Sequence, residues 1–367
     1  MLTRLWVDNF RSFVNFDLNL GDRQLIIGLN GSGKSTLLQV LNSLKRLIIN
    51  GDNPEDLFPE STLTKWHGSQ RQGFELEVKI DGSVYLFRLE LGRGGPAAKA
   101  RIDREKVLCD GRPLFDFTRG EVHLFNDFFE DKVQYPFDPF KSALATIRPR
   151  QENTRLTKFK TWVENLCCVQ INPHAINSRS ESEEPELPEF DFANFASWYR
   201  HMSQERGDRT EVLRNHLKEI IPGFTSLDST FAGGRVRILK ARFQGESSTD
   251  YSLNFTELSD GQRALICLYS LLDFLVDRGT CLVIDEPENF IAIPEIQPWL
   301  IELLDRIEEV GGQVILTSHH PEVVNYLAPE LGIILERDGP GPVRVRPYSD
   351  TGMLAPAEAI ARGWTGS

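Results

Sequence analysis

The feature that most constrains this chain is the glycine-rich stretch "GLNGSGKSTLLQV" at residues 28–40. It fits the pattern G-x-x-x-x-G-K-[ST], with Gly28, Gly33, Lys34 and Ser35 at the fixed positions, and it follows the apolar run "QLIIG". A strand, a glycine loop and a helix in this order gather backbone N–H groups and a helix N-terminus around one concavity. The stretch therefore predicts a loop that binds nucleotide phosphates, with a glycine turn that binds no ligand as the alternative.

Two later apolar runs end in residues suited to phosphoryl chemistry. The run "CLVIDEPEN" contains Asp285 and Glu286, and "GQVILTSHH" ends in Ser318, His319 and His320. Open α/β sheets bind ligands at the carboxyl ends of their strands, so we expect these residues beside the loop. Asp285 suits magnesium, usually through water, Glu286 suits an attacking water, and a histidine suits the γ-phosphate. We favour His319 over His320; surface carboxylates and a structural histidine are the alternatives.

A second helix start has the same affinity for anions. In "ELSDGQRALICL", Ser259 suits an N-cap, Gly261 permits close approach of the backbone, and a long helix follows. A plain helix cap is the alternative. One chain thus offers two phosphate-seeking helix starts for one nucleotide.

The pattern of apolar residues predicts an α/β fold. Residues 2–20 alternate apolar and polar side chains in two runs, which favours an antiparallel pair, and Asp81-Gly82 between two alternating runs predicts a hairpin. From about residue 260 onward, helices and strands alternate, which indicates a parallel sheet covered on both faces. Residues 191–222 are interpreted as two helices. Residues 92–190 are harder to interpret, and their acidic stretch "SESEEPELPEF" is typical of an exposed or mobile loop.

Composition narrows the class of protein. Of 367 residues, 40% are hydrophobic, and no apolar run approaches the ~18 residues of a membrane span. We expect no secretory signal, because the N-terminus "MLTRLWVDNF" has neither a long apolar core nor a small-residue cleavage site. The five cysteines are an odd number and show no C-x-x-C spacing, which favours the cytoplasm; Cys267 and Cys281 are interpreted as buried small hydrophobic residues.

The net charge of -12 argues against a protein whose whole surface binds nucleic acid. Two basic segments, residues 92–106 and 148–160, are local candidates for DNA contact, with a solvated loop as the favoured interpretation of either.

In this order, the motifs resemble those of the ATP-binding-cassette (ABC) class of ATPases: "GLNGSGKS" as Walker A, "LSDGQ" as the signature, "LVIDE" as Walker B and "TSHH" as the switch histidine. The resemblance implies a P-loop NTPase fold: an ABC-type ATPase head with a mixed sheet, an N-terminal antiparallel β subdomain and an inserted helical lobe. We expect a single head over residues 1–367, with the nucleotide-binding core at 1–50 and 250–345 and the inserted β-hairpin and helical lobe at 51–250.

The resemblance implies ATP and Mg²⁺ as cofactors and assigns roles to the motif residues. Glu286, Lys34 and His319 would be catalytic, and Ser35 and Asp285 would serve the metal. The ATP-binding set would comprise Gly28, Asn30, Gly31, Ser32, Gly33, Lys34, Ser35, Thr36, Arg11, Ser259, Gly261 and Gln262. In this class two ATPs are sandwiched between two heads, each held by one chain's Walker A and the other chain's signature. That arrangement accounts for the second anion site and implies a homodimer when ATP is bound.

Within the class, the chain resembles the RecF-like and overcoming-lysogenisation-defect-like (OLD-like) branch. "VDNFRSF" resembles the branch's N-terminal signature, whose arginine, here Arg11, approaches the nucleotide, and "SDGQR" and "DEPEN" point the same way. The OLD-like pattern often continues to Leu-His-Pro where this chain has "FIAIPEIQPW", so the loop that communicates across the dimer is expected to differ. The Q-loop glutamine has several candidates: Gln70, Gln72, Gln134 and Gln151.

OLD-like proteins frequently carry a C-terminal TOPRIM nuclease, and the residues after the last expected strand hold no cluster of metal-binding carboxylates. We therefore expect a stand-alone AAA_21-type ATPase without a nuclease. The leading interpretation is an ATP-hydrolysing dimer, or a higher oligomer, that gates DNA or a separately encoded nuclease or toxin in bacterial anti-phage defence, without a membrane partner. RecF-like DNA repair is the nearest alternative, and the nucleotide-binding subunit of a transporter is a third. ATP rather than GTP follows from the class alone.

Overall fold

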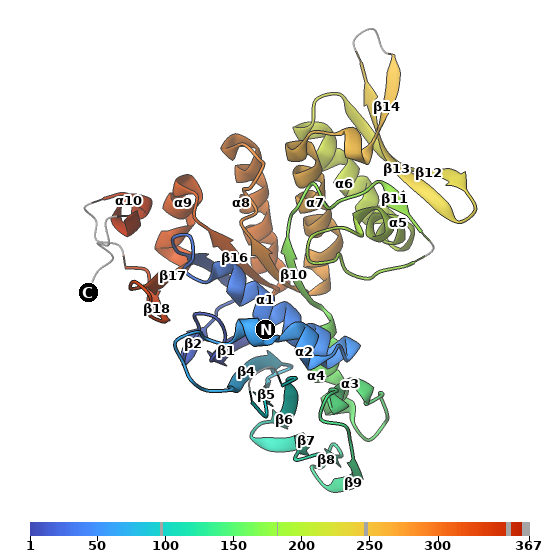
Figure 1. Ribbon diagram of the computed structural model, residues 1–367. Coiled ribbons are helices and arrows are strands. Elements are labelled where there is room, and N and C mark those ends of the chain that lie inside the picture. The colour runs from blue at the N-terminus through green and yellow to red at the C-terminus, as the bar shows by residue number, and fades with distance from the viewer. Residues whose placement is uncertain (96–97, 182, 246–248, 350–353, 362–367) are drawn as a thin grey trace. The chain divides into compact units, whose positions relative to one another are not determined.

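The computed structural model describes residues 1–95, 98–181, 183–245, 249–349 and 354–361. The chain forms two compact units, one of residues 1–166 with 323–367 and one of residues 167–322. Both units combine helices with strands, in the α/β class expected from the sequence (Figure 1). Among the helices of the described residues, none has the length and apolar character that crossing a membrane requires.

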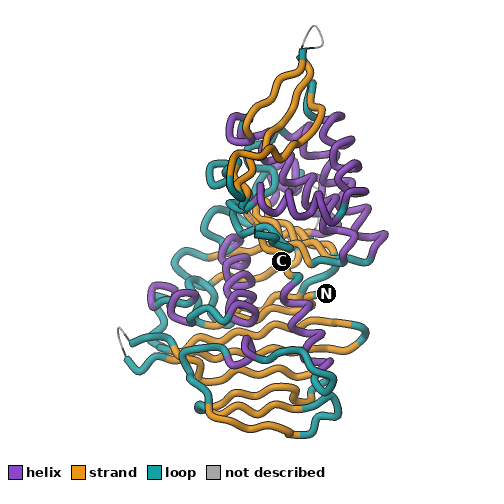
Figure 2. The backbone as a smooth tube through the Cα atoms, turned by 90° about the vertical axis from the view of Figure 1, so that its right-hand side faces the viewer, coloured by secondary structure: helices purple, strands orange, loops and turns teal. Residues whose placement is uncertain are grey.

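The first unit contains an antiparallel sheet, whose strands lie side by side as a ladder in Figure 2. The strand order is β2-β1-β4-β5-β6-β7-β8-β9. The strands are β1 (Leu2–Asp8), β2 (Phe16–Asn19), β4 (Arg71–Ile80), β5 (Ser83–Gly92), β6 (Arg101–Cys109), β7 (Arg112–Thr118), β8 (Glu121–Phe125) and β9 (Asp131–Pro136).

Local turn chemistry shapes two of the pairings in this sheet. Asp81 and Gly82 have φ of 49° and 83°, and Ile80 pairs with Ser83 across them. Two successive residues with positive φ match the twist of antiparallel strands, so the turn holds β4 against β5. The antiparallel pair of β1 and β2 also forms, and both predictions are confirmed.

The interpretation of residues 92–106 as a solvated loop is wrong for residues 101–106, which belong to β6. Residues 93–95 and 98–100 lie outside helices and strands, and residues 96–97 lie outside the described residues. The following residues, which the sequence left unassigned, supply β7 to β9. The strand β6 buries Ile102, Val107 and Cys109 on one side and carries charged residues on the other. An antiparallel sheet can face water on one side, so alternate charged residues are compatible with a strand.

The second basic stretch and the acidic stretch have different outcomes. Residues 148–153 lie outside helices and strands, but α4 (Thr154–Glu164) takes the rest of the basic stretch. The described residues of "SESEEPELPEF" from Glu183 onward lie outside helices and strands.

The first unit also carries the glycine loop. β3 (Arg23–Ile27) precedes the loop and pairs in parallel with β17 (Gly332–Arg337), which pairs antiparallel with β18 (Val343–Pro347). α1 follows the loop and buries the apolar side chains of one face. The helices of this unit are α1 (Lys34–Lys45), α2 (Pro54–Leu57), α3 (Ala143–Thr146), α4, most of α9 (Pro321–Leu331) and α10 (Pro356–Ala361).

The second unit contains two sheet segments and the longest helices. β15 (Cys281–Asp285) pairs in parallel with β16 (Gln313–Ser318), and β10 (Leu166–Gln170) neighbours β15. The other sheet is built from β11 (Arg179–Ser180), β12 (Phe224–Gly233), β13 (Val236–Gln244) and β14 (Asp250–Asn254). The helices are α5 (Phe195–Glu205), α6 (Gly207–Ile220), α7 (Asp260–Leu275) and α8 (Ile293–Val310). The two helices expected within residues 191–222 are α5 and α6.

The core of the second unit centres on α7. Residues Ala264 to Leu275 are all buried, and the indole of Trp299 on α8 donates a hydrogen bond to the carbonyl of Leu268. Cys267 and Cys281 are free and buried, as expected.

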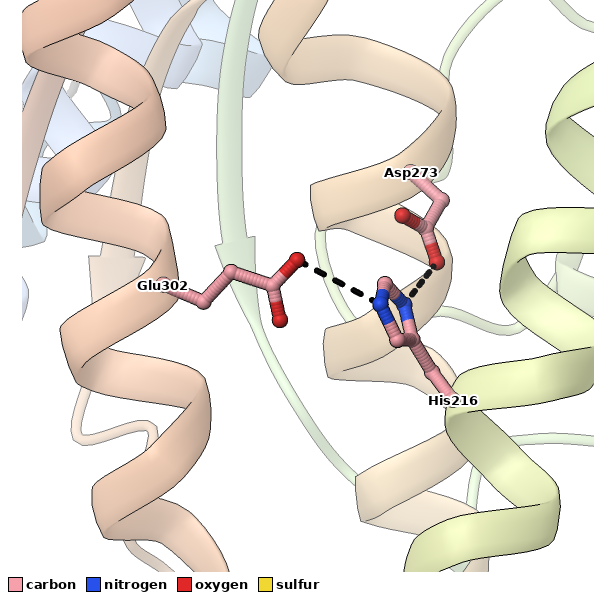
Figure 3. A group of neighbouring side chains, drawn as sticks. All are labelled: His216, Asp273 and Glu302. Carbon is pink, nitrogen blue, oxygen red and sulfur yellow. Dashed lines mark hydrogen bonds and ion pairs between the residues drawn. The ribbon is translucent and has the colours of Figure 1, made fainter.

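A network of charged side chains joins α6, α7 and α8 (Figure 3). Nδ1 of His216 lies 2.9 Å from the carboxylate of Asp273, and Nε2 lies 3.4 Å from Glu302. Arg306 donates to the other oxygen of Asp273 at 2.9 Å, and Asp273 has no exposed surface. The imidazole of His216 and the carboxylates of Asp273 and Glu302 place their ligand atoms within 4.8 Å of one another, which is close enough to hold a metal ion. Because the Arg306 cation already compensates Asp273, we interpret the group as a structural ion-pair network.

Candidate nucleotide site

The glycine loop of the first unit has the conformation that its sequence predicts. Gly33 has φ of 104° and precedes Lys34, the first residue of α1. The Lys34 ammonium folds back along the loop and donates to the carbonyl of Gly28 at 2.7 Å. α1 has no side-chain cap and no acidic residue in its first turn, so its terminal N–H groups suit an anion.

Two glycines of the loop are required for close packing. A Cβ on Gly28 would lie 2.6 Å from the carbonyl oxygen of Leu335 and would also crowd Oγ of Ser32, and a Cβ on Gly33 would lie 2.7 Å from the ring of Phe13. Ser32 Oγ is itself buried and has no hydrogen-bond partner in the described part of the chain. Terminal N–H groups, a lysine and an orphaned hydroxyl together fit a phosphate group.

The other predicted residues of the first unit lie around this loop. Asn30 and Gly31 are exposed, Ser35 is half-buried and Thr36 is buried. Arg11 is exposed, has φ of 52°, and places its guanidinium 5.9 Å from the centre of the Phe10 ring. Paired backbone hydrogen bonds between Phe10 and Phe13 close the turn that carries Arg11. The "NFRSF" stretch therefore meets the loop through Phe13, which fills the space beside Gly33.

In the second unit, Asp285 is held at the end of β15 by two donors. Its two carboxylate oxygens accept from the hydroxyl of Thr317 at 2.5 Å and from the side-chain amide of Gln170 at 2.8 Å. Asp285 is 1% exposed. Carboxylate oxygens are ligands that a hydrated magnesium ion prefers, so the residue type suits a cation.

Glu286 and His319 form a close pair beside Asp285. Nδ1 of His319 lies 2.7 Å from Oε1 of Glu286, and the side-chain amide of Asn289 donates to the other oxygen at 3.1 Å. Glu286 has φ of 46°, a strained conformation that is typical of functional sites. The ring of His320 makes a different contact. It accepts a hydrogen bond from the backbone N–H of Glu322 in the first turn of α9.

A second glutamate lies buried two residues further along. Glu288 is 5% exposed and accepts a hydrogen bond from the hydroxyl of Ser318 at 2.5 Å. Burial raises the pKa of the Glu288 carboxyl above its ordinary value, and the negative charge of Glu286 acts in the same direction.

The signature residues form a helix cap. The Ser259 hydroxyl accepts from the backbone N–H of Gln262, and the Gln262 side chain accepts in return from the backbone N–H of Ser259, which is a capping box. A Cβ on Gly261 would lie 2.9 Å from the carbonyl of Phe290. The glycine is therefore required where α7 packs against the loop after β15.

Sequence reasoning missed Gln170. It ends β10, the strand beside β15, and its amide contacts Asp285, whereas Gln72 is buried against Asn9 and Gln134 contacts Asp131. The run "LCCVQINP" carried the signal, because it is an apolar strand that ends in a polar residue, like the two strands that we did select.

Comparisons with known proteins identify the family and the fold. The model of the AAA_21 family, described as "AAA domain, putative AbiEii toxin, Type IV TA system", matches residues 25–325. The ABC transporter ATP-binding protein ARB1 of Saccharomyces cerevisiae is 25% identical over 132 residues, which are 36% of this chain and 20% of that protein. The chain therefore spans about a fifth of that relative's length.

Two solved structures share the fold. One is an Smc head bound to the C-winged helix domain of ScpA, with a TM-score of 0.53 and 13% identity over 94% of this chain and 98% of that chain. The other is an Smc head domain with an extended coiled coil bound to the C-terminal domain of ScpA from Pyrococcus furiosus, with a TM-score of 0.52 and 11% identity over 94% and 95%. The predicted P-loop NTPase fold is confirmed. The chain belongs to the AAA_21 family, and it shares its fold with the two Smc heads.

Proposed function

We propose that this protein binds ATP and hydrolyses it, and that the Glu286–His319 pair carries the reaction. The observation behind the proposal is a carboxylate 2.7 Å from an imidazole nitrogen, at the ends of neighbouring strands and next to the buried Asp285. A carboxylate in this setting can orient and deprotonate a water molecule for in-line attack on a phosphoryl group.

The binding roles follow from the donor sets. The loop N–H groups and Lys34 would bind the phosphates, and Ser35 and Asp285 offer the oxygen ligands that magnesium prefers. When bound, magnesium neutralises charge on the phosphate oxygens. The contacts of Gln170 and Thr317 hold the Asp285 carboxylate in one orientation for that role.

We propose further that ATP closes a dimer, and that closure gates DNA or a separately encoded effector in anti-phage defence. The exposed Ser259 at the start of α7 supports the dimer, because in the class that the motifs resemble the signature of one copy contacts the ATP held by the glycine loop of the other copy. The family description, which names a toxin, supports an effector, and so do the related Smc heads, which are bound to a domain of another protein. Nucleotide contacts would then shift the population between open and closed states, and hydrolysis would reset it.

The test compares wild type with Glu286→Gln, and with Glu309→Gln as a matched control on the exposed end of α8. We expect Glu286→Gln to lower kcat by roughly 10²- to 10⁴-fold. It should also accumulate as a dimer with ATP and magnesium, because binding persists without turnover. Mass photometry on the same samples measures the assembly. A Glu286→Gln protein that stays monomeric at saturating ATP contradicts the sandwich.

Turnover and assembly of the same samples are also measured with duplex DNA. This measurement distinguishes gating of DNA from gating of a separately encoded effector. Turnover stimulated by DNA supports a DNA-gated clamp. Turnover that DNA leaves unchanged, together with a stable higher assembly, favours regulation of a separate effector.

A RecF-like role in DNA repair is the second candidate, and one cavity favours it. This cavity, of about 920 Å³, lies on the antiparallel sheet of the first unit and is lined by Arg71, Arg101, Arg104 and Arg119 against two carboxylates. The pairing of β5 with β6 skips Asp103, and this bulge brings Arg101 and Arg104 to the same face. This alternative predicts direct DNA binding that weakens steeply with salt and is lost in an Arg101→Ala, Arg104→Ala double variant.

A further inference from the structure

Glu288 has no role in the proposed reaction, yet its surroundings are unusual for a structural residue. It is 5% exposed, and one of its two oxygens is buried without a hydrogen-bond partner in the described part of the chain. Burying a carboxyl group that is only half satisfied costs free energy, and an apolar side chain of similar volume would avoid that cost. Among the described residues, the short hydrogen bond of Glu288 is with Ser318, and we therefore look for a function at this contact.

Ser318 links this contact to the catalytic pair. Its hydroxyl donates to Glu288 Oε1 at 2.5 Å and accepts from the backbone N–H of His320 at 3.0 Å. The two hydrogen bonds fix the backbone on both sides of His319, the residue between them. Ser318 has no exposed surface, whereas the His319 side chain is 45% exposed. The buried pair of Glu288 and Ser318 therefore holds the backbone of His319 in place, although the His319 side chain is partly exposed.

The same turn fixes the partner of His319. Glu286 and Glu288 belong to one tight turn after β15, closed by the backbone hydrogen bond from Asn289 to Glu286. The hydrogen bond that Ser318 donates to Glu288 is buried. It therefore links the segment that carries Glu286 to the segment that carries His319.

We propose that Glu288 is a positioning residue, which sets the contact between His319 and Glu286 through its hydrogen bond with Ser318. The inference rests on the proposed ATP hydrolysis for its kinetic consequence, but the geometry that it concerns can be measured without turnover. Glu288 touches neither water nor nucleotide in this role; it acts only through Ser318 and the backbone of His319.

The kinetic test uses Glu288→Ala, Ser318→Ala and their combination. Each single variant is expected to lower kcat roughly ten- to hundredfold with KM for ATP unchanged, because a small misplacement of a catalytic group is costly. The double variant should be no worse than either single one, since both remove the same bond. Glu288→Gln should retain most activity, because its amide oxygen still accepts from Ser318. Ser270→Ala, which removes another fully buried serine hydroxyl bonded within α7, is the matched control and should behave as wild type.

A His319→Ala background shows whether the effect passes through the histidine. There, Glu288→Ala should cause no further loss. An equal loss in that background, an unchanged kcat in Glu288→Ala, or a Glu288→Gln protein as impaired as Glu288→Ala would each overturn the proposal.

A spectroscopic arm keeps the inference testable if no ATP is hydrolysed. The ¹⁵Nδ1 resonance of His319, assigned by its absence in His319→Ala, should move in Glu288→Ala and Ser318→Ala but not in Ser270→Ala. A resonance that stays in place overturns the positioning role. Absence of turnover in wild type would instead count against the proposed function alone.

Discussion

Gly31 and Gly33 adopt backbone conformations that side chains disfavour, with φ of 80° and 104°, but they differ in the space around them. A Cβ at Gly33 would lie 2.7 Å from the Phe13 ring, and one at Gly31 would meet nothing within 4 Å. We expect Gly33→Ala to lower the free energy of unfolding by about 1–3 kcal/mol more than Gly31→Ala, because overpacking adds to a similar backbone strain. Urea unfolding of both variants measures the difference. Equal losses would mean that Phe13 moves aside without cost.

At the scale of elements, three helices of the second unit share charges at His216. Its hydrogen bond to Asp273 raises the pKa of the imidazole above its ordinary value, against the opposing effect of burial. Glu302 acts in the same direction as Asp273, Arg306 opposes it, and the Tyr269 ring packs against the imidazole. A histidine with a raised pKa in the folded state binds its proton more tightly there than in the unfolded chain.

This contact should make stability depend on pH. The contribution of His216 is fully present below its unfolded pKa of about 6.5 and is lost as the pH rises through the higher folded value. We therefore expect the gap in unfolding free energy between wild type and His216→Gln to shrink as the pH rises from about 6 to about 9. Urea unfolding across that range measures it, with the exposed His67→Gln as control. A gap that widens with pH would contradict the protonated contact.

At the scale of the whole molecule, the proposed sandwich requires each ATP to contact two copies of the chain. Lys34→Ala would remove phosphate binding by the glycine loop, and Ser259→Arg would disrupt the signature. Each variant alone should therefore hydrolyse no ATP. Ser259 is exposed, and loss of its cap costs only about 1 kcal/mol, so the substitution should leave the fold intact. Mixing the two variants should restore turnover, because one of the two sites in a mixed dimer is complete. Each variant at doubled concentration is the control, and a mixture without turnover would contradict sharing of sites.

Local chemistry explains what could be predicted at each scale. The glycine loop, the hairpin at Asp81-Gly82 and the parallel strands that end at Asp285 and Ser318 follow from turn residues and apolar periodicity. These signals lie within a few residues of one another, and they were sufficient for the α/β class. The roles of the individual site residues remain predictions until turnover is measured.

The sequence by itself determined where phosphates can be bound and which strand ends carry acids and histidines, because these features depend on neighbours along the chain. Tertiary structure alone decided that β6 to β9 pair as a sheet, that Phe13 fills the space beside Gly33, and that Gln170 contacts Asp285 across 115 positions of sequence. The reason is physical. Which strand finds which partner, and which buried polar group finds its hydrogen bond, depends on contacts between distant segments, and apolar periodicity carries no record of those partners.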